Sequence, residues 1–263
     1  MVFIGIIPAR YASTRFPGKP LVDLCGKPVI QHVYEQASKA LDHVVVATDD
    51  ERIYDCVKGF GGEVVMTSAD HTCGTDRVYE AYQIYSANSS LANNEDIVVV
   101  NIQGDEPFIQ PEQIQALMDC FPTEIATLVH PFSRKDTWED LQNPNYVKVA
   151  IARTATDDST TIGKALYFSR SVVPYMRGAD KDQWLNQGTY YRHIGMYAYR
   201  ADILEKITSL SPTLLEKTEC LEQLRWLENG LTIHVGLSHH ASIGIDTPED
   251  LQAAIQYLNS ISL

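Results

Sequence analysis

Three cations stand within ten residues of one another near the start of the chain, directly after an apolar run. The stretch IIPARYASTRFPGKP, residues 6–20, contains Arg10, Arg15 and Lys19. Residues 1–27 hold four basic residues and one acidic residue, although the whole chain has a formal net charge of −13. Cations beside a turn that contains Ser and Gly can bind phosphate oxygens together with backbone N–H groups. The position after a strand favours this interpretation over a solvated loop with rim salt bridges.

Neither of two familiar phosphate-binding motifs explains this loop. Lys19 is followed by Pro20 where a Walker A motif needs Ser or Thr, and Ser13 stands where that motif needs Gly. The run GFGG at residues 59–62 lacks the glycine spacing of a dinucleotide-binding fingerprint and precedes an expected strand instead of opening a helix. The sequence therefore indicates a phosphate site of another kind.

Two aspartates stand where the ligands of a metal ion would be expected. Asp105 lies in NIQGDEP, residues 101–107, and Asp246 lies in IGIDTP, residues 243–248; each segment follows an apolar run. We expect both aspartates at the ends of strands and in one crevice with the basic loop. Two carboxylates suit Mg²⁺ when substrate phosphates complete its ligands. The alternatives are a turn residue for Asp105 and a helix cap for Asp246.

Apolar runs alternate with helical patterns through the first hundred residues. These runs are apolar throughout, which is typical of strands buried on both faces of a parallel sheet. The expected fold class is therefore α/β, with a mostly parallel sheet covered by helices on both faces. The expected strands span residues 2–7, 44–47, 63–66 and 97–100, and the expected helices span residues 28–41, 50–60 and 75–85.

The second half of the chain has a more mixed pattern. Thr247 and Asp250 predict a capping box at the start of the last helix, followed by a buried apolar stripe. No linker or repeat interrupts the chain, so we expect residues 1–263 to form a single domain. The expected strands span residues 125–129, 146–152, 162–167 and 194–199, some of them antiparallel, and the expected helices span residues 218–227 and 247–258, with Leu251, Ile255 and Leu258 in the stripe.

The composition excludes some classes of protein. The acidic balance argues against non-specific nucleic-acid binding, which depends on many phosphate contacts by Lys and Arg. The five cysteines include no C-x-x-C pair, so neither a zinc site nor a disulfide framework is indicated. No apolar run reaches the roughly 20 residues needed to span a bilayer. We expect a cytoplasmic protein without a membrane or nucleic-acid partner.

Eight segments of the chain, in their order and spacing, resemble one known family. They are IIPARYASTRFPGKPL, VATDD, MTSADHTCGTDR, VNIQGDEP, ALYFSRS, RHIGMYAYR, LEQLR and GIDTPEDL. Together they resemble the 3-deoxy-manno-octulosonate cytidylyltransferases, or CMP-Kdo synthetases, from residue 3 to about residue 251. The first segment is shared in looser form with CMP-sialate synthetases. The resemblance implies a Rossmann-like nucleotide-diphospho-sugar transferase fold with a smaller mixed or antiparallel portion in the second half.

The resemblance also implies a reaction. The anomeric hydroxyl of 3-deoxy-D-manno-octulosonate (Kdo) would attack the α-phosphorus of CTP, giving CMP-Kdo and pyrophosphate with Mg²⁺ as cofactor, and so activate Kdo for lipopolysaccharide biosynthesis. Such chemistry needs alignment and charge neutralisation more than a side-chain nucleophile. The family further implies a homodimer, with the sugar-acid-binding and dimerisation portion within about residues 125–200.

By the same resemblance, the site residues fall into groups. Arg10, Lys19 and Asp105 would be catalytic, and Asp105 and Asp246 would bind the metal. The residues implied for the nucleotide are Pro8, Ala9, Arg10, Ser13, Lys19, Gly74 and Arg77. The residues implied for the sugar acid are Arg77, Gln103, Arg170, His193, Tyr197, Glu222 and Gln223.

Several of these roles have alternatives. Arg170 could form a structural salt bridge instead of pairing with the Kdo carboxylate, and His193 could be a core histidine bonded to backbone. We expect Glu222 and Gln223 to point away from the apolar side of their helix, either toward sugar hydroxyls or toward solvent. For the whole protein, the alternatives are an enzyme acting on sialic acid or 8-amino Kdo, and a non-catalytic nucleotide-binding module.

Overall fold

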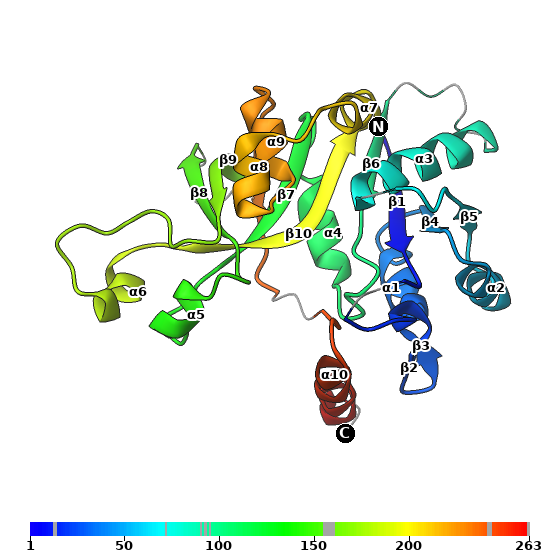
Figure 1. Cartoon of the computed structure of the whole chain (residues 1–263), viewed down its shortest axis with the longest axis horizontal. Coiled ribbons are helices and arrows are strands. Elements are labelled where there is room, and N and C mark those ends of the chain that lie inside the picture. Colours follow the sequence, from blue (N-terminus) through cyan, green and yellow to red (C-terminus); the bar gives the residue numbers. More distant parts are fainter. Residues whose placement is uncertain are drawn as a thin grey trace. The chain divides into compact units, whose positions relative to one another are not determined.

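The computed structural model describes residues 1–12, 15–71, 73–89, 91, 94, 96–154, 161–240 and 244–261 (Figure 1). The chain packs as two compact units. Unit 1 is made from Met1–Ile114, Arg200–Thr208 and Ser242–Leu263, and unit 2 is made from Gln115–Tyr199 and Ser209–Ala241. The expectation of a single domain stays a prediction.

Unit 1 is built on a parallel sheet with the strand order β5-β4-β1-β6. Its strands are β1 (Val2–Ala9), β4 (His43–Thr48), β5 (Val64–Met66) and β6 (Ile97–Asn101). Each neighbouring pair is parallel. The interior of β1 and the whole of β6 are buried, which explains why these strands are unbroken apolar runs. The prediction of a parallel sheet is confirmed.

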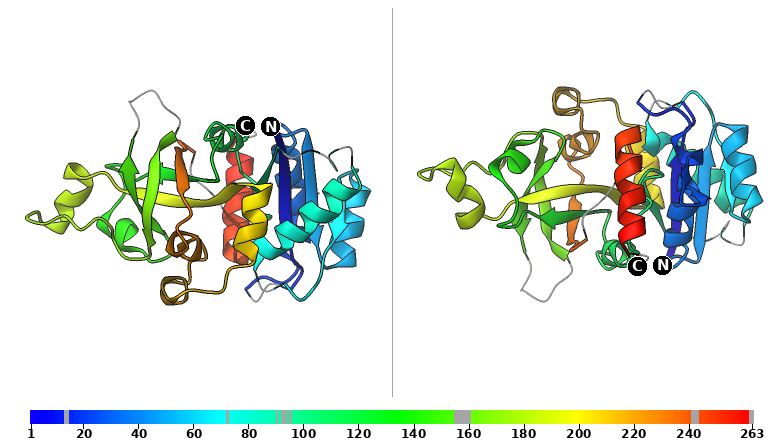
Figure 2. Two further views of the ribbon diagram at one scale, coloured as in Figure 1. Left: turned by 90° about the horizontal axis from the view of Figure 1, so that it is seen from above. Right: turned by 90° about the horizontal axis from the view of Figure 1, so that it is seen from below.

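Helices cover both faces of this sheet. The chain moves outward from β1 to β4 and β5 through α1 (Val29–Ala37) and α2 (Glu51–Gly59), then returns to β6 through α3 (Gly74–Ala87). Because parallel crossovers are right-handed, this reversal places α3 on the opposite face from α1 and α2. A further helix, α7 (Ala201–Thr208), packs beside α3 (Figure 1 and Figure 2).

Short elements stand between β1 and α1. They are the 3-10 turn η1 (Lys19–Leu21) and a small hairpin of β2 (Asp23–Leu24) and β3 (Lys27–Pro28). The predicted helix over residues 28–41 is correspondingly shorter, because Pro28 is its N-cap and it ends at Ala37. The turn η1 places Lys19 directly after the basic loop.

The last helix, α10 (Pro248–Ile261), begins where the sequence predicts. Thr247 N–H donates to the Asp250 carboxylate at 2.9 Å, and Asp250 N–H donates to Thr247 Oγ1 at 3.2 Å, which together form the predicted capping box. The stripe of Leu251, Ile255 and Leu258 packs against a buried cluster that includes Leu24, Val29, Phe108, Ile245 and Ala254. This packing fixes the segment that precedes the helix.

Unit 2 is built on a mixed sheet with the strand order β10-β7-β11-β9-β8. Its strands are β7 (Ile125–Pro131), β8 (Lys148–Arg153), β9 (Thr161–Ser169), β10 (Tyr191–Arg200) and β11 (Ile233–Leu237). The β11–β7 pair is parallel, and the other neighbours are antiparallel. The predicted antiparallel strands are confirmed, whereas β11 is not among the predicted strands.

Several short helices accompany this sheet. They are α5 (Trp138–Gln142), η2 (Lys181–Gln183) and α6 (Trp184–Gln187), and the chain passes from unit 1 to unit 2 within α4 (Pro111–Met118). Side chains of the connections pack around the buried residues Leu141, Trp184 and Tyr190. In the described part of the chain, no helix combines the length and the apolar character that a membrane crossing requires.

The prediction of one helix over residues 218–227 is wrong, because the chain forms two shorter helices there. One, α8 (Leu214–Glu219), ends at Cys220, and the next, α9 (Gln223–Glu228), begins three residues later. Cys220 has φ 52° and ψ 50°, the left-handed conformation in which helices commonly end and which favours glycine. Since no Gly or Pro marks the position, the apolar spacing alone gave no signal of the break.

We predict that Cys220→Gly stabilises the fold, because glycine adopts the left-handed conformation without the steric cost of a Cβ atom. The free energy of unfolding should rise by about 1 kcal/mol in urea denaturation. The matched control is Cys56→Gly inside α2, where glycine should lower the free energy of unfolding. A loss of stability in both variants would contradict this explanation of the helix break.

Candidate active site

A cavity of about 410 Å³ lies at the carboxyl end of the parallel sheet in unit 1. Its walls come from the end of β1, the basic loop, the start of α3, the turn after β6 and the segment before α10. The lining residues are Pro8, Ala9, Arg10, Ala12, Arg15, Lys19, Pro20, Gly74, Arg77, Gln103, Gly104, Asp105 and Asp246. Ligands of open α/β sheets bind at this end of the strands. The structure therefore brings the basic loop and both predicted metal-binding aspartates into one pocket.

The Lys19 ammonium joins the two aspartates. Its Nζ lies 2.6 Å from Asp105 Oδ2 and 3.0 Å from Asp246 Oδ1. The lysine side chain is only 12% exposed. Burial alone would lower the pKa of Lys19, but the charges and hydrogen bonds of the two carboxylates outweigh it and raise that pKa. Lys19 is therefore held as a cation, and both carboxylates converge on one point.

Asp246 reaches this point by a route that differs from the prediction. In the described residues the last strand before it is β11, which ends at Leu237, and Asp246 lies in the segment that leads into α10. Ile245 N–H donates to the Asp105 carbonyl oxygen at 2.8 Å, which ties the two aspartate-bearing segments together. Asp105 lies in a turn beyond the end of β6, beside Gly104. A Cβ atom on Gly104 would stand 2.7 Å from the Pro8 carbonyl oxygen, so only glycine lets this turn approach β1.

The basic loop is closed by its own backbone and by an aromatic ring. Gly18 N–H donates to the Tyr11 carbonyl oxygen at 2.8 Å, and Gly18 has φ 72°, which favours glycine. The Arg52 guanidinium lies over the Tyr11 ring, 3.3 Å from its centre, and also forms a two-pronged pair with Asp50. These contacts fix the backbone from which Arg10 and Lys19 project.

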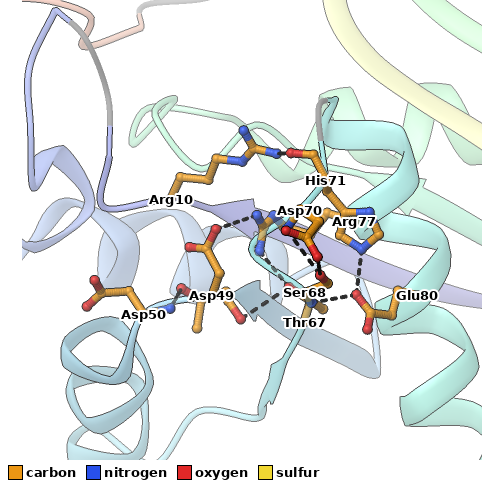
Figure 3. Close-up of polar contacts among 10 residues, drawn as sticks. Arg10, Asp49, Asp50, Thr67, Ser68, Asp70, His71, Arg77 and Glu80 are labelled. Atoms are coloured by element: carbon orange, nitrogen blue, oxygen red, sulfur yellow. Dashed lines mark hydrogen bonds and ion pairs between the residues drawn. The ribbon is translucent and has the colours of Figure 1, made fainter.

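Arg77 is held by an ion pair beneath the pocket (Figure 3). Its side chain has no exposed surface; Nη2 lies 2.6 Å from Asp49 Oδ2, and Nη1 donates to Thr67 Oγ1 at 2.6 Å. Two turns that follow β4 and β5 are thereby fixed to the first turn of α3, which also places Gly74 at the pocket wall. The role of Arg77 toward the nucleotide or sugar acid stays a prediction. Asp49 is a positioning residue that the sequence did not indicate.

Arg10 contacts the segment that precedes α3. Its guanidinium donates to the His71 carbonyl oxygen. The His71 ring bonds the Glu80 carboxylate at 2.5 Å, and that carboxylate also accepts from Ser68 N–H at 2.8 Å (Figure 3). No role was predicted for His71, because its partner Glu80 lies nine residues away and no motif joins them. Of the other residues predicted to bind nucleotide, Ser13 lies outside the described residues.

In unit 2, two of the residues predicted for the sugar acid lie on one strand. His193 and Tyr197 both belong to β10, and their rings are 5.2 Å apart. The His193 ring bonds Thr127 Oγ1 at 3.0 Å, and burial lowers its pKa from 6.5 to about 3, so it is neutral at physiological pH. Burial raises the pKa of Tyr197 well above its usual value, and the nearby charge of Glu222 adds to this shift.

Arg170, at the end of β9, is bonded to main-chain oxygens. Nε donates to Glu219 O at 2.7 Å, and the two Nη atoms donate to Pro144 O and Cys220 O. The carbonyl oxygen of Arg170 accepts in turn from the buried Lys148 at 2.5 Å. Three of the five guanidinium N–H donors are used by these bonds, which fix the orientation of Arg170. Its role toward a carboxylate stays a prediction.

Gln223 differs from the prediction that it points away from the core. It is 5% exposed, in the first turn of α9. Its Nε2 is a buried donor without a hydrogen-bond partner in the part of the chain that the structure describes. Buried donors without partners are costly and call for an explanation such as a ligand. Glu222, the N-cap of α9, stands beside it.

The carboxylates of unit 1 fit a magnesium ion better than a fully protein-bound metal. Within the described residues, no three side chains of His, Cys, Asp or Glu gather where they could hold a metal ion. Mg²⁺ is commonly bound by one or two carboxylates, with water and substrate phosphates as its other ligands. Asp105 and Asp246 supply that donor set beside a basic loop.

Comparison with known proteins agrees with this geometry. Residues 4–233 match the family model described as cytidylyltransferase. The structure of CMP:2-keto-3-deoxy-manno-octonic acid synthetase complexed with CTP aligns with a TM-score of 0.83 and 36% identity, covering 99% of this chain and 100% of that one. A 4-diphosphocytidyl-2C-methyl-D-erythritol synthase from Anaerococcus prevotii, at 15% identity and a TM-score of 0.58, shares the fold. The fold is that of a nucleotidyltransferase.

Similar proteins of known name show which family of cytidylyltransferases the chain belongs to. The chain is 58% identical over 261 residues to 3-deoxy-manno-octulosonate cytidylyltransferase of Phocaeicola vulgatus and 56% identical over 262 residues to that of Parabacteroides distasonis. In each case the match covers 98% of both chains. The chain belongs to the 3-deoxy-manno-octulosonate cytidylyltransferase family.

We predict that Asp49→Asn destabilises the fold strongly, because it leaves the buried Arg77 guanidinium without its counter-charge. The free energy of unfolding should fall by about 3 kcal/mol in urea denaturation. The neighbouring Asp50, which caps α2, provides the control, since Asp50→Ala should cost only about 1 kcal/mol. Equal losses in the two variants would show that the Asp49–Arg77 pair has no special weight.

We predict that the low pKa of His193 makes the fold less stable as pH falls. The unfolded chain takes up this proton below about pH 6.5, whereas the folded chain takes it up only near pH 3, so the free energy of unfolding falls with pH between these values. The slope from this group should approach about 1.4 kcal/mol per pH unit. Urea denaturation between pH 7 and pH 5 should show a smaller loss for His193→Gln than for the wild type. Parallel pH dependences would contradict the prediction.

Proposed function

We propose that the chain transfers CMP from CTP to the anomeric hydroxyl of Kdo, giving CMP-Kdo and pyrophosphate in an Mg²⁺-dependent reaction. The observation that carries this proposal is the convergence of Lys19, Asp105 and Asp246 at one point of a pocket lined by the basic loop. Membership of the family, with relatives that carry this activity in their names, supports the choice of substrates.

The residues of unit 1 serve the triphosphate. Arg10, Arg15 and Lys19 line the pocket and offer positive charge to the phosphate oxygens. Asp105 and Asp246 would hold Mg²⁺, which, when bound, neutralises phosphate charge and polarises the α-phosphorus. Pro8, Ala9, Gly74 and Arg77 would surround the rest of the nucleotide. Because the Arg77 pair is fixed by internal bonds, Arg77 is positioned before the substrate arrives.

The chemical step needs alignment more than a nucleophilic side chain. The anomeric oxygen of Kdo forms a bond to the α-phosphorus as it loses its proton, and the bond from that phosphorus to the bridging oxygen breaks. Pyrophosphate leaves with the bonding electrons, and its developing charge is stabilised by Arg10 and Lys19. Fixed cations reduce the barrier because they need no reorganisation during the reaction.

The residues of unit 2 would recognise the sugar acid. Arg170 is oriented by three carbonyl oxygens and retains N–H donors suited to a carboxylate. Gln223 offers a buried donor to a hydroxyl, with Glu222 beside it. Both His193 and Tyr197 are neutral at physiological pH, because the pKa of His193 is lowered and that of Tyr197 is raised. They can therefore make hydrogen bonds without adding charge. Gln103, also predicted for the sugar acid, lines the pocket of unit 1.

The cellular setting and the assembly belong to the same proposal. The five cysteines, all in the described ranges, are free thiols, which supports a reducing cytoplasm. The family supports a homodimer formed through the second half of the chain. CMP-Kdo would serve lipopolysaccharide biosynthesis as an activated sugar donor.

The test of the proposal is an assay of pyrophosphate release with CTP and several sugar acids. Release should require CTP, Kdo and Mg²⁺ together, and mass spectrometry should identify CMP-Kdo. A clear preference for sialic acid or 8-amino Kdo would mean that this acid, and not Kdo, is the substrate. Binding of CTP without turnover of any acid would show a non-catalytic module.

We predict that Asp105→Asn lowers kcat by at least about a hundredfold while the fold stays intact. Without the negative charge of Asp105, the site would bind the metal ion more weakly, and the charge of that ion acts mainly in the transition state. Steady-state kinetics with CTP and Kdo measures the effect, and circular dichroism checks the fold. The exposed Asp55→Asn on α2 is the control and should leave kcat unchanged. Near-normal turnover of Asp105→Asn would remove this residue from the site.

We predict that the protein sediments as a dimer at micromolar concentration. Analytical ultracentrifugation over a dilution series measures the molecular mass against the 29.4 kDa of one chain. A single species at the monomer mass throughout the series would reject the homodimer.

A further inference from the structure

Lys19 occupies the oxygens that the proposed metal would need. Its ammonium bonds one oxygen of Asp105 and one oxygen of Asp246 directly. Mg²⁺ bonds carboxylate oxygens at 2.0–2.1 Å, so a metal and the ammonium that share the Asp105 oxygen would be at most about 5 Å apart. Two cations at that separation, in a pocket with little solvent around Lys19, repel each other. Metal binding through these two oxygens therefore requires the ammonium to move.

The charge of the pocket strengthens this competition. Three cations line it, Arg10, Arg15 and Lys19, against the two carboxylates, while the fourth lining cation, Arg77, is paired with Asp49. Arg15 adds a second contact to Asp246, with Nη1 3.1 Å from Oδ2. The pocket is thus balanced toward positive charge, which favours a triphosphate and disfavours a free divalent metal.

The backbone around Lys19 allows the ammonium to change partner. Gly18 and Tyr11 close the loop, and Lys19 begins the turn η1, so its Cα position is fixed. The four-carbon stem of lysine can nevertheless rotate, and its compact ammonium has no directional preference between carboxylate and phosphate oxygens. The same loop geometry can therefore present the charge to either partner.

We propose that Lys19 is an internal cation that blocks Asp105 and Asp246 until a triphosphate draws its ammonium away, so that metal binding becomes conditional on the nucleotide. This inference rests on the proposed function for the identity of the nucleotide and the metal. It assigns Lys19 a second role besides stabilising the leaving group, because it controls when the metal site opens. A free site would otherwise take up metal without substrate.

The experiment is a titration of the full chain with Mn²⁺ alone, without nucleotide or sugar acid, followed by electron paramagnetic resonance of the free ion. Lys19→Met should bind Mn²⁺ about tenfold more tightly than the wild type, within the range usual for coupled sites. Lys19→Arg, which keeps the charge, should bind as weakly as the wild type. Lys58→Met is the matched control, since it removes the same charge from an exposed position on α2 and should change nothing.

Two further measurements make the result specific. Adding Asp246→Asn to Lys19→Met should abolish the gain in Mn²⁺ affinity, and CTP alone should bind more weakly to Lys19→Met than to the wild type. Lys19→Gln repeats the test if the Met variant has a lowered melting temperature. Equal Mn²⁺ affinity in the wild type and the Lys19 variants, or a gain that survives Asp246→Asn, would overturn the inference. Because no CTP or Kdo is present in the metal titration, its outcome is independent of whether the protein forms CMP-Kdo.

Discussion

The contact of one lysine ammonium with two aspartates distant in sequence is the constraint on which the site depends. Asp105 follows the strand β6 and Asp246 precedes the helix α10, and Lys19 bonds both. Backbone features make the contact possible, since Gly104 allows close approach to β1 and Ile245 N–H bonds the Asp105 carbonyl oxygen. The packing of α10 on its buried cluster then keeps this segment in place. Hence packing of the hydrophobic core brings together the carboxylates of Asp105 and Asp246, which are far apart in the sequence.

Much of unit 1 could be predicted from the sequence because its signals are local. Strands buried on both faces are unbroken apolar runs, as β1 and β6 show, and the capping box of Thr247 and Asp250 marks its helix within four residues. The basic loop was visible because its charge differs from that of the whole chain. Its joining to Asp105 followed from the rule that ligands bind at the carboxyl ends of parallel strands.

The remaining features depend on contacts that no local pattern encodes. Asp49 and Arg77 are 28 residues apart, and their pairing arises only when β4 and α3 pack together. No Gly or Pro marks the helix break at Cys220, so the spacing of the apolar residues predicted one continuous helix across it. Gln223 is buried in the first turn of α9, directly after the charged Glu222, and no local pattern indicates this. Likewise, Ile245, the residue before Asp246, is not in a strand; its N–H donates to the Asp105 carbonyl oxygen instead.

Crystals grown with Mn²⁺ and CTP would show where the metal binds relative to Lys19 and the two aspartates. Anomalous scattering locates Mn²⁺ without ambiguity against the lighter atoms of the protein. We expect one site about 2.1 Å from an oxygen of both Asp105 and Asp246, with triphosphate oxygens among its ligands and the Lys19 ammonium on the phosphates. Mn²⁺ held by the triphosphate alone, with Lys19 still bonded to both carboxylates, would contradict this expectation.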